Sequence, residues 1–266
     1  MSRPTGTWSS GAAYEAYVGR WSRAVAGRFV PSLDASGGGG WIDVGCGTGV
    51  LTAAVLEHAA PSSVLGLDAS TAFVQVARER VVDPRVRFEV GDATDLPVGS
   101  STVDAVVSGL VLNFLPDRLR ALTEWHRVLG PGGLLGLYVW DYAGEMQLMR
   151  RLWDAAAELD PVAAALDEGR LSAFCSPGPL RELAEAAGFA EVRVDAIDVP
   201  TVFRDFDDFW TPFLGGTGPA PAYVAGLAPE ARERLRGLLD ARLPRDEGGA
   251  IPLVARAWAV RARRPD

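Results

Sequence analysis

Apolar positions along the chain follow two spacings, one typical of amphipathic helices and one of buried strands. From Tyr14 to Val30 they recur every three or four residues, which predicts a helix. Between residues 41 and 140, short apolar runs alternate with helical spacings. The runs predict five strands, at Trp41–Val44, Ser63–Leu67, Val86–Val90, Val103–Ser108 and Leu134–Tyr138.

Helices are expected between these strands. The spacings favour Val50–Ala59, a helix running to Val81 that Ser70 would cap, and Asp117–Leu129. Gly130-Pro131-Gly132-Gly133 would end the last of them, because proline cannot continue a helix. Strands that alternate with helices need right-handed crossovers, so a mostly parallel sheet covered on both faces is predicted.

The chain changes character after residue 140. Tyr142–Ala173 is rich in alanine and helical in spacing, which suits an insertion lying over the sheet. Further elements are expected as helices at Pro179–Ala187 and Pro229–Leu243 and as strands at Glu191–Ile197 and Leu253–Val260. The fold class is therefore predicted to be α/β, with a Rossmann-like, seven-stranded, mostly parallel sheet flanked by helices.

Charge and composition limit the partners and the cofactors that the chain can bind. The 266 residues carry 34 acidic and 26 basic side chains, a net charge of −8, which disfavours nucleic acid and anionic membranes as partners. All the basic residues are arginines, so Schiff-base, pyridoxal-phosphate and P-loop lysines are excluded. Two cysteines and two histidines are too few and too scattered for a metal site.

The sequence also bears on where the protein is located and whether it forms oligomers. The N-terminus lacks the apolar run of a signal peptide, and no apolar stretch reaches the roughly 18 residues that span a bilayer. A cytoplasmic protein without a membrane partner is therefore expected. The sequence leaves a homodimer open.

A glycine-rich turn joins the first predicted strand of the core to the helix after it. It reads Asp43-Val44-Gly45-Cys46-Gly47-Thr48-Gly49. Glycine lets the backbone turn sharply and lets a ligand approach, and the helix start offers unpaired N–H groups. The dinucleotide fingerprint needs a further glycine where this chain has Val50, so the spacing leans away from NAD.

The turn resembles the first motif of the class I S-adenosylmethionine-dependent methyltransferases, of the small-molecule branch that includes quinone and natural-product enzymes. Four later segments agree in order and spacing: Val64–Asp68, Gly91–Pro97, Val103–Ser108 and Glu124–Gly133. The resemblance implies S-adenosylmethionine as cofactor and a small-molecule acceptor. It also implies one domain over residues 1–266, with a helical cap segment at 1–40, a cofactor-binding core at 41–140, and an insertion with the C-terminal strands and substrate side at 141–266.

The resemblance also implies which residues hold the cofactor. Asp43 would serve the amino end of its methionine part through water or neighbouring backbone. Asp68 would accept from both ribose hydroxyls, and Asp92 would accept from the adenine amino group. The Ala93 N–H would meet a ring nitrogen, and the backbone near Ser108 would face the sulfonium. The other expected contacts are Gly45, Cys46, Gly47, Gly49 and Ala69. Apart from the resemblance, Arg20 on the first predicted helix is a candidate clamp for the cofactor's carboxylate or for an anionic group of the substrate.

Groups for the methyl acceptor are sought outside these motifs. Candidates for its pocket are Tyr14, Trp21, Asn113, Trp140, Tyr142, Phe174, Trp210 and Phe213. Aromatic residues at helical spacing equally fit an ordinary core. Asp141, Tyr17 and His126 are the candidate catalytic groups, although His126 also suits a packing role and positioning alone can drive methyl transfer.

The predicted function is transfer of a methyl group to oxygen, nitrogen or carbon of a small, fairly apolar metabolite. Two alternatives stay open. One is an NAD(P)-dependent oxidoreductase built on the same sheet, and the other is a catalytically inactive, regulatory protein that binds the cofactor.

Overall fold

The computed structural model describes residues 19–35, 37–215 and 218–266. Contacts between Cα atoms divide the chain into two compact units. The sheet unit comprises Ser22–Trp140, Phe174–Ile197 and Ala257–Asp266. The helical unit comprises Asp141–Ala173, Asp198–Arg256 and the described residues up to Trp21. This division differs from the three consecutive segments predicted, because the sheet unit also takes in segments distant in sequence from its core.

Seven strands form one sheet in the order β3-β2-β1-β4-β5-β7-β6. They are β1 (Gly40–Val44), β2 (Ser63–Asp68), β3 (Val86–Val90), β4 (Val103–Gly109), β5 (Leu129–Trp140), β6 (Ala190–Phe203) and β7 (Ile251–Arg263). Strands β1 to β5 are parallel, and β7 runs antiparallel to β5. The predicted Rossmann-like, mostly parallel sheet is confirmed. Its order reverses between β1 and β4, and open α/β sheets bind ligands beyond the carboxyl ends of strands at such a point.

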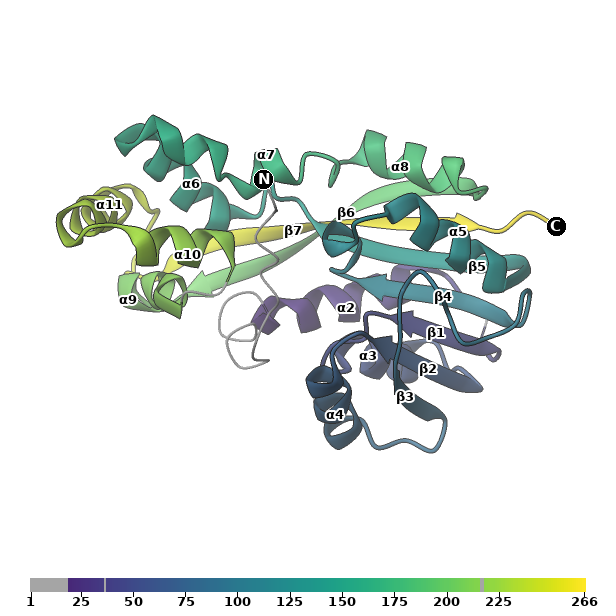
Figure 1. Ribbon diagram of the computed structural model, residues 1–266. Coiled ribbons are helices and arrows are strands. Elements are labelled where there is room, and N and C mark those ends of the chain that lie inside the picture. Colours follow the sequence, from purple (N-terminus) through teal and green to yellow (C-terminus); the bar gives the residue numbers. More distant parts are fainter. Residues whose placement is uncertain (1–18, 36, 216–217) are drawn as a thin grey trace. The chain divides into compact units, whose positions relative to one another are not determined.

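The helices described in the sheet unit are α2 (Arg20–Ser32), α3 (Val50–His58), α4 (Thr71–Arg80), α5 (Arg118–Val128) and α8 (Pro177–Ala186), with a short 3-10 turn, η2, at Leu112–Phe114. Two of them, α4 and α5, begin at a side-chain cap. The Ser70 hydroxyl accepts from Phe73 N at 3.4 Å, and the Asp117 carboxylate accepts from Arg120 N at 2.9 Å. Helices α5 and α8 lie side by side (Figure 1).

In the helical unit, the segment Tyr142–Ala173, which was predicted to be helical, is divided into separate helices. Its elements are α6 (Gln147–Leu159), η3 (Pro161–Ala165), α7 (Glu168–Leu171), α9 (Phe206–Trp210), η4 (Thr211–Gly215), α10 (Pro219–Gly226) and α11 (Pro229–Arg242). Helix α6 ends before Asp160, whose carboxylate accepts from Val162 N at 3.0 Å. Pro161 has no N–H to continue the ladder, so the chain turns there.

Aromatic rings fill the interior of the helical unit. Phe209 packs edge-on against Phe203 at 5.4 Å and meets Phe213 at 5.6 Å between ring centroids. Trp21 meets Phe203 at 5.5 Å. All four rings are buried. Burial of this aromatic surface stabilises a unit that has few strands of its own.

Candidate functional site

The glycine-rich turn leaves β1 at its carboxyl end and enters α3. The N–H groups of Gly45 and Cys46 both donate to the Leu67 carbonyl, at 2.7 and 2.9 Å, so the turn is fixed to the end of β2. Gly45 has φ of +73°, and a Cβ there would lie 2.2 Å from Cγ2 of Val111. Only glycine fits this position without a clash.

Gly47 has a different role in the same turn. Its φ is +53°, yet a Cβ added there would meet no atom of the described chain within 4 Å. Its N–H donates to Oδ2 of Asp68 at 3.0 Å. The backbone at Gly47 therefore borders open space, as a position approached by a ligand requires.

Asp43 is the most buried acid of the site. Its side chain has 0% exposure, and its Oδ2 accepts from the Thr52 hydroxyl at 2.6 Å. Oδ1 is buried and has no hydrogen-bond partner among the described residues. Burial, reinforced by the charge of Asp68, raises the pKa of Asp43 to about 7, although the bond from Thr52 opposes the shift. A carboxylate oxygen in this state is suited to a cationic or N–H-bearing ligand.

Asp68 ends β2 and is half-buried. Its Oδ1 accepts from Ser70 N at 2.8 Å and its Oδ2 accepts from Gly47 N at 3.0 Å. Burial raises its pKa, and the two backbone bonds act in the opposite direction. Each oxygen keeps a further lone pair, so the carboxylate can still accept from two hydroxyls.

The loop after β3 presents one acceptor and one donor. Asp92 Oδ1 accepts from both the N–H and the hydroxyl of Thr94, at 2.8 and 2.9 Å. These bonds, the backbone one first, lower the pKa of Asp92. Within the described chain nothing donates to Asp92 Oδ2, and the N–H of Ala93 donates to no residue. This pair matches the donor amino group and acceptor ring nitrogen along one edge of adenine.

Three other predicted cofactor residues lie near these groups. Ala69 follows Asp68 and is exposed. The Ser108 hydroxyl donates to the Val44 carbonyl at 2.7 Å, which ties the ends of β4 and β1 together. Cys46 turns its thiol into a core cluster with Val74, Ala77 and Phe88, and burial raises its pKa. Cys46 can therefore serve a ligand through its backbone but not as a thiolate.

Three of the predicted acceptor residues, Asn113, Phe174 and Trp140, lie in the sheet unit. Asn113 lies in η2, and Phe174 carries the Arg118 guanidinium 3.7 Å above its ring. Trp140 ends β5 with 1% exposure, and its indole N–H has no partner among the described residues. An unpaired buried donor costs about 1–3 kcal/mol, so Trp140 is the strongest of these candidates for contact with a ligand.

Several other candidates lie in the helical unit and have structural partners there. The Asp141 carboxylate accepts from Gly144 N and Glu145 N, at 3.1 and 2.9 Å, and so holds a turn. Tyr142 is buried, and its carbonyl accepts from Arg150. Trp21, Trp210 and Phe213 belong to the aromatic interior, with exposures of 6%, 5% and 0%. Their predicted place in the acceptor pocket stays a prediction.

Three predicted residues at the N-terminus receive no placement. Tyr14 and Tyr17 lie outside the described residues. Arg20 is described only as the first backbone position of α2. Their predicted roles stay predictions.

His126 lies away from the glycine-rich turn. It lies in the last turn of α5, just before β5 begins. Strands β1, β4 and β5 run parallel, and the glycine turn follows the carboxyl end of β1, whereas His126 lies at the amino end of β5. Its ring packs edge-on against Phe189 at 5.1 Å, and burial lowers its pKa. A base must reach the reacting atoms, and His126 lies at the opposite edge of the sheet.

The sequence motifs did not indicate which residues hold Asp43 and the loop after β3 in place by hydrogen bonds. Thr52 holds Asp43, and Trp125 donates its indole N–H to the Ala93 carbonyl at 2.8 Å. Glu124 accepts from Leu96 N at 2.7 Å. Their spacing from the motif residues along the chain reaches 32 positions, so no local pattern announces these bonds.

Similarity to known proteins agrees with this geometry. The family described as "Methyltransferase domain" matches residues 42–137. A trans-aconitate 2-methyltransferase of Deinococcus radiodurans is 31% identical over 212 residues, which are 76% of this chain and 79% of that protein. The chain belongs to the class I S-adenosylmethionine-dependent methyltransferase family.

Other relatives are matched over shorter shares. A trans-aconitate 2-methyltransferase of Methylobacterium radiotolerans is 34% identical over 157 residues, 58% of each chain. A demethylmenaquinone methyltransferase of Lactiplantibacillus plantarum is 41% identical over 99 residues, 35% of this chain and 42% of that one. The chain thus spans less than two thirds of the length of these two relatives.

A solved structure shares the fold. Phosphoethanolamine N-methyltransferase 2 of Haemonchus contortus, in complex with S-adenosyl-L-methionine, superposes with a TM-score of 0.59 at 20% identity. The match covers 99% of this chain and 59% of that one. Among the described residues no helix has the length and apolar character to cross a membrane, and no cluster of side chains suits a metal ion.

Proposed function

We propose that the chain binds S-adenosylmethionine at the carboxyl ends of β1, β2 and β3 and transfers its methyl group to a small, fairly apolar metabolite. The observation that carries the proposal is the buried Oδ1 of Asp43, which has no partner among the described residues. S-adenosylmethionine offers an ammonium group to such an oxygen, whereas the pyrophosphate of NAD is anionic. Asp43 and Asp68 beside the glycine turn therefore favour the sulfonium cofactor.

The residues present fit the rest of this cofactor. The open backbone at Gly47 accommodates the methionine part, and Asp68 can accept from two ribose hydroxyls. Asp92 Oδ2 and the Ala93 N–H offer the acceptor and donor that adenine needs. S-adenosylmethionine, when bound, supplies an electrophilic methyl group whose bond to sulfur breaks as a nucleophile's lone pair forms a bond to carbon.

The chain's own contribution is mainly placement. Binding converts the reaction from a bimolecular encounter to one within a complex, which lowers the barrier without a dedicated base. With His126 at the opposite edge of the sheet and the Asp141 carboxylate held in a turn, positioning carries the catalysis. A proton released by an oxygen or nitrogen nucleophile passes to solvent.

We expect the acceptor to be a small, fairly apolar metabolite, with oxygen, nitrogen or carbon as the methylated atom. The net charge of −8 disfavours nucleic acid as the acceptor, because binding its phosphates needs a basic surface.

Calorimetry with S-adenosylhomocysteine and with NADH tests the cofactor. We expect binding of the first and none of the second; binding of NADH alone would overturn the proposal in favour of an oxidoreductase. Transfer of labelled methyl from S-adenosylmethionine to a panel containing trans-aconitate and a demethylated quinol then tests the acceptor class. Cofactor binding without turnover of any acceptor in the panel or in a metabolite extract would instead favour a regulatory protein.

A further inference from the structure

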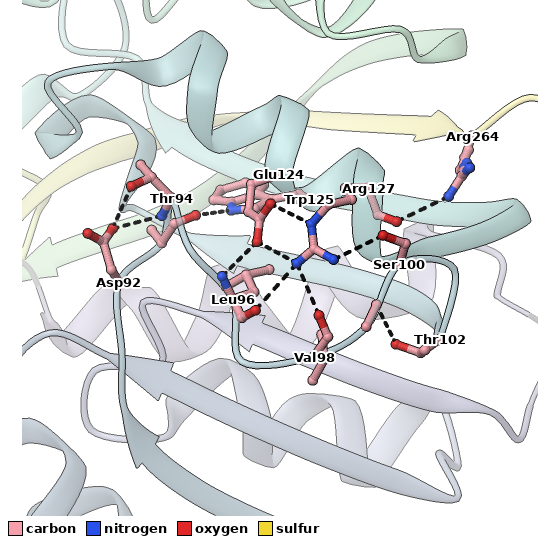
Figure 2. A network of polar contacts seen from close by, with 12 residues as sticks. Asp92, Thr94, Leu96, Val98, Ser100, Thr102, Glu124, Trp125, Arg127 and Arg264 are labelled. Carbon is pink, nitrogen blue, oxygen red and sulfur yellow. Dashed lines mark hydrogen bonds and ion pairs between the residues drawn. The ribbon is translucent and has the colours of Figure 1, made fainter.

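Helix α5 holds the loop after β3 through several side chains (Figure 2). The indole N–H of Trp125, a residue with 0% exposure, donates to the Ala93 carbonyl at 2.8 Å. Three residues further on, the N–H of Leu96 donates to Oε1 of Glu124 at 2.7 Å. Helix α5 thus binds the loop at two points, Ala93 and Leu96.

Arg127 adds further hydrogen bonds between helix α5 and the loop. Its guanidinium donates to both oxygens of Glu124 at 2.7 Å and to the Val98 carbonyl at 3.0 Å, and it also reaches the Ser100 hydroxyl at 3.2 Å (Figure 2). The bonds to Arg127 lower the pKa of Glu124, so the pair stays ionised at neutral pH. The Glu124 side chain is only 13% exposed, which limits screening by solvent.

These bonds leave the loop with few free polar groups. The N–H of Gly91 donates to the Asp68 carbonyl, the N–H of Thr94 donates to the Asp92 carboxylate, and the N–H of Asp95 donates to the Asp92 carbonyl. Inside this turn the Ala93 N–H donates to no group of the described chain, and the carbonyl of the same residue accepts from Trp125. The Ala93 carbonyl shares a planar peptide unit with the Thr94 N–H, and the Asp92 carbonyl, which accepts from Asp95 N at 3.2 Å, shares one with the Ala93 N–H. Because the peptide units on both sides of Ala93 are held, the direction of the Ala93 N–H is fixed.

We propose that Trp125, with the Glu124–Arg127 pair, is a positioning residue that sets the orientation of Ala93 and thereby the selectivity of the site for adenine. The inference rests on the proposed cofactor function. Adenine presents a donor amino group beside an acceptor ring nitrogen, and a hypoxanthine base presents the reverse. A loop held in one orientation distinguishes the two; a loop free to rotate its peptides does so less well.

Trp125→Phe tests the proposal by removing the indole N–H while keeping an aromatic ring. Trp41→Phe is the matched control, because Trp41 is also buried and its indole N–H also donates to a carbonyl, that of Gly38. Calorimetry measures binding of S-adenosylhomocysteine and of its 6-oxo analogue, S-inosylhomocysteine, to each full-length protein. Thermal unfolding is followed in parallel.

We expect Trp125→Phe to bind S-adenosylhomocysteine about threefold to tenfold more weakly, as loss of one neutral hydrogen bond predicts. Its preference over the 6-oxo analogue should shrink, whereas Trp41→Phe should keep both affinity and preference. General destabilisation would weaken both ligands equally, so the ratio isolates positioning. An unchanged ratio in Trp125→Phe would overturn the inference.

Arg127→Lys keeps the test decisive if Trp125→Phe fails to fold. Lysine retains the charge but cannot span both Glu124 and the loop carbonyls, so a smaller loss of preference is expected. An unchanged preference in Arg127→Lys would then count against the inference. Failure of the unmodified protein to bind S-adenosylhomocysteine would refute the cofactor proposal itself, which separates the two outcomes.

Discussion

Thr52 donates its hydroxyl to Oδ2 of Asp43 across 2.6 Å, and this bond leaves Oδ1 of the same carboxyl group buried without a partner in the described part of the chain. The two residues join α3 to the end of β1, on either side of the glycine turn. The acid is therefore held in place before any ligand arrives, and its ionisation becomes coupled to binding.

Cofactor affinity should depend on pH through Asp43. The pKa of its carboxyl group is raised to about 7 by burial, and a bound ammonium group would favour the ionised form. Below that pKa the site must release a proton on binding, so affinity for S-adenosylhomocysteine should rise with pH and then level off. By linkage, calorimetry should find binding about tenfold weaker near pH 6 than near pH 8. Asp43→Asn should bind more weakly and lose this dependence; a parallel pH profile in the variant would contradict the assignment.

Two glycines of one turn should respond differently to alanine. Gly45→Ala brings a Cβ to 2.2 Å from Val111 at a positive φ, so unfolding free energy should fall by about 2–4 kcal/mol. Gly47→Ala meets no neighbour of the described chain and should cost only about 1 kcal/mol through its φ. Binding of S-adenosylhomocysteine should nevertheless be lost in Gly47→Ala. Thermal unfolding and calorimetry check both; full affinity in Gly47→Ala would show that no ligand approaches there.

Asp68→Ala should weaken binding of S-adenosylhomocysteine tenfold or more, because hydrogen bonds to a charged group are worth about 1.5–3 kcal/mol. Asp83→Ala is a suitable control. Asp83 is also an acid held in local hydrogen bonds, but it pairs with Arg85 before β3 instead of ending β2. The Asp83→Ala variant should bind S-adenosylhomocysteine as tightly as the unmodified protein does. A loss of less than threefold in Asp68→Ala would exclude a direct ribose contact.

Stability should depend on pH through Glu168 in the helical unit. Glu168 is buried and accepts from the Trp153 indole at 3.1 Å, and burial raises its pKa from 4.5 to about 7. The folded state thus holds the proton more tightly than the unfolded chain. The stabilisation is complete below the unfolded pKa and is lost as pH rises through about 7.

Glu168→Gln mimics the protonated form, so it should remove this share of the pH dependence of the unfolding temperature. Glu158→Gln, at an exposed pair with Arg242, serves as the control and should leave the slope between pH 5 and pH 8 nearly unchanged. Equal slopes in Glu168→Gln and the unmodified protein would rule out a folded-state pKa near neutrality.

The sequence by itself determined the elements of the core and indicated its candidate ligand-binding residues. Strand and helix periods between residues 41 and 140, and caps at Ser70 and Asp117, act over a few residues and so can be read locally. The glycine spacing with Asp68 and Asp92 indicated the family for the same reason. The breaks after residue 140 were harder to foresee, because Asp160-Pro161 interrupts a spacing that otherwise continues as a helix.

Only the tertiary structure decided what each polar side chain does. His126 packs on Phe189, Asp141 closes a turn, and the rings at Trp210 and Phe213 form an interior, although the sequence allowed each a place at the site. The bonds from Thr52 to Asp43 and from Trp125 to Ala93 join residues on different elements. Burial and hydrogen bonding between distant positions depend on how the elements pack, and a local pattern carries no record of that packing.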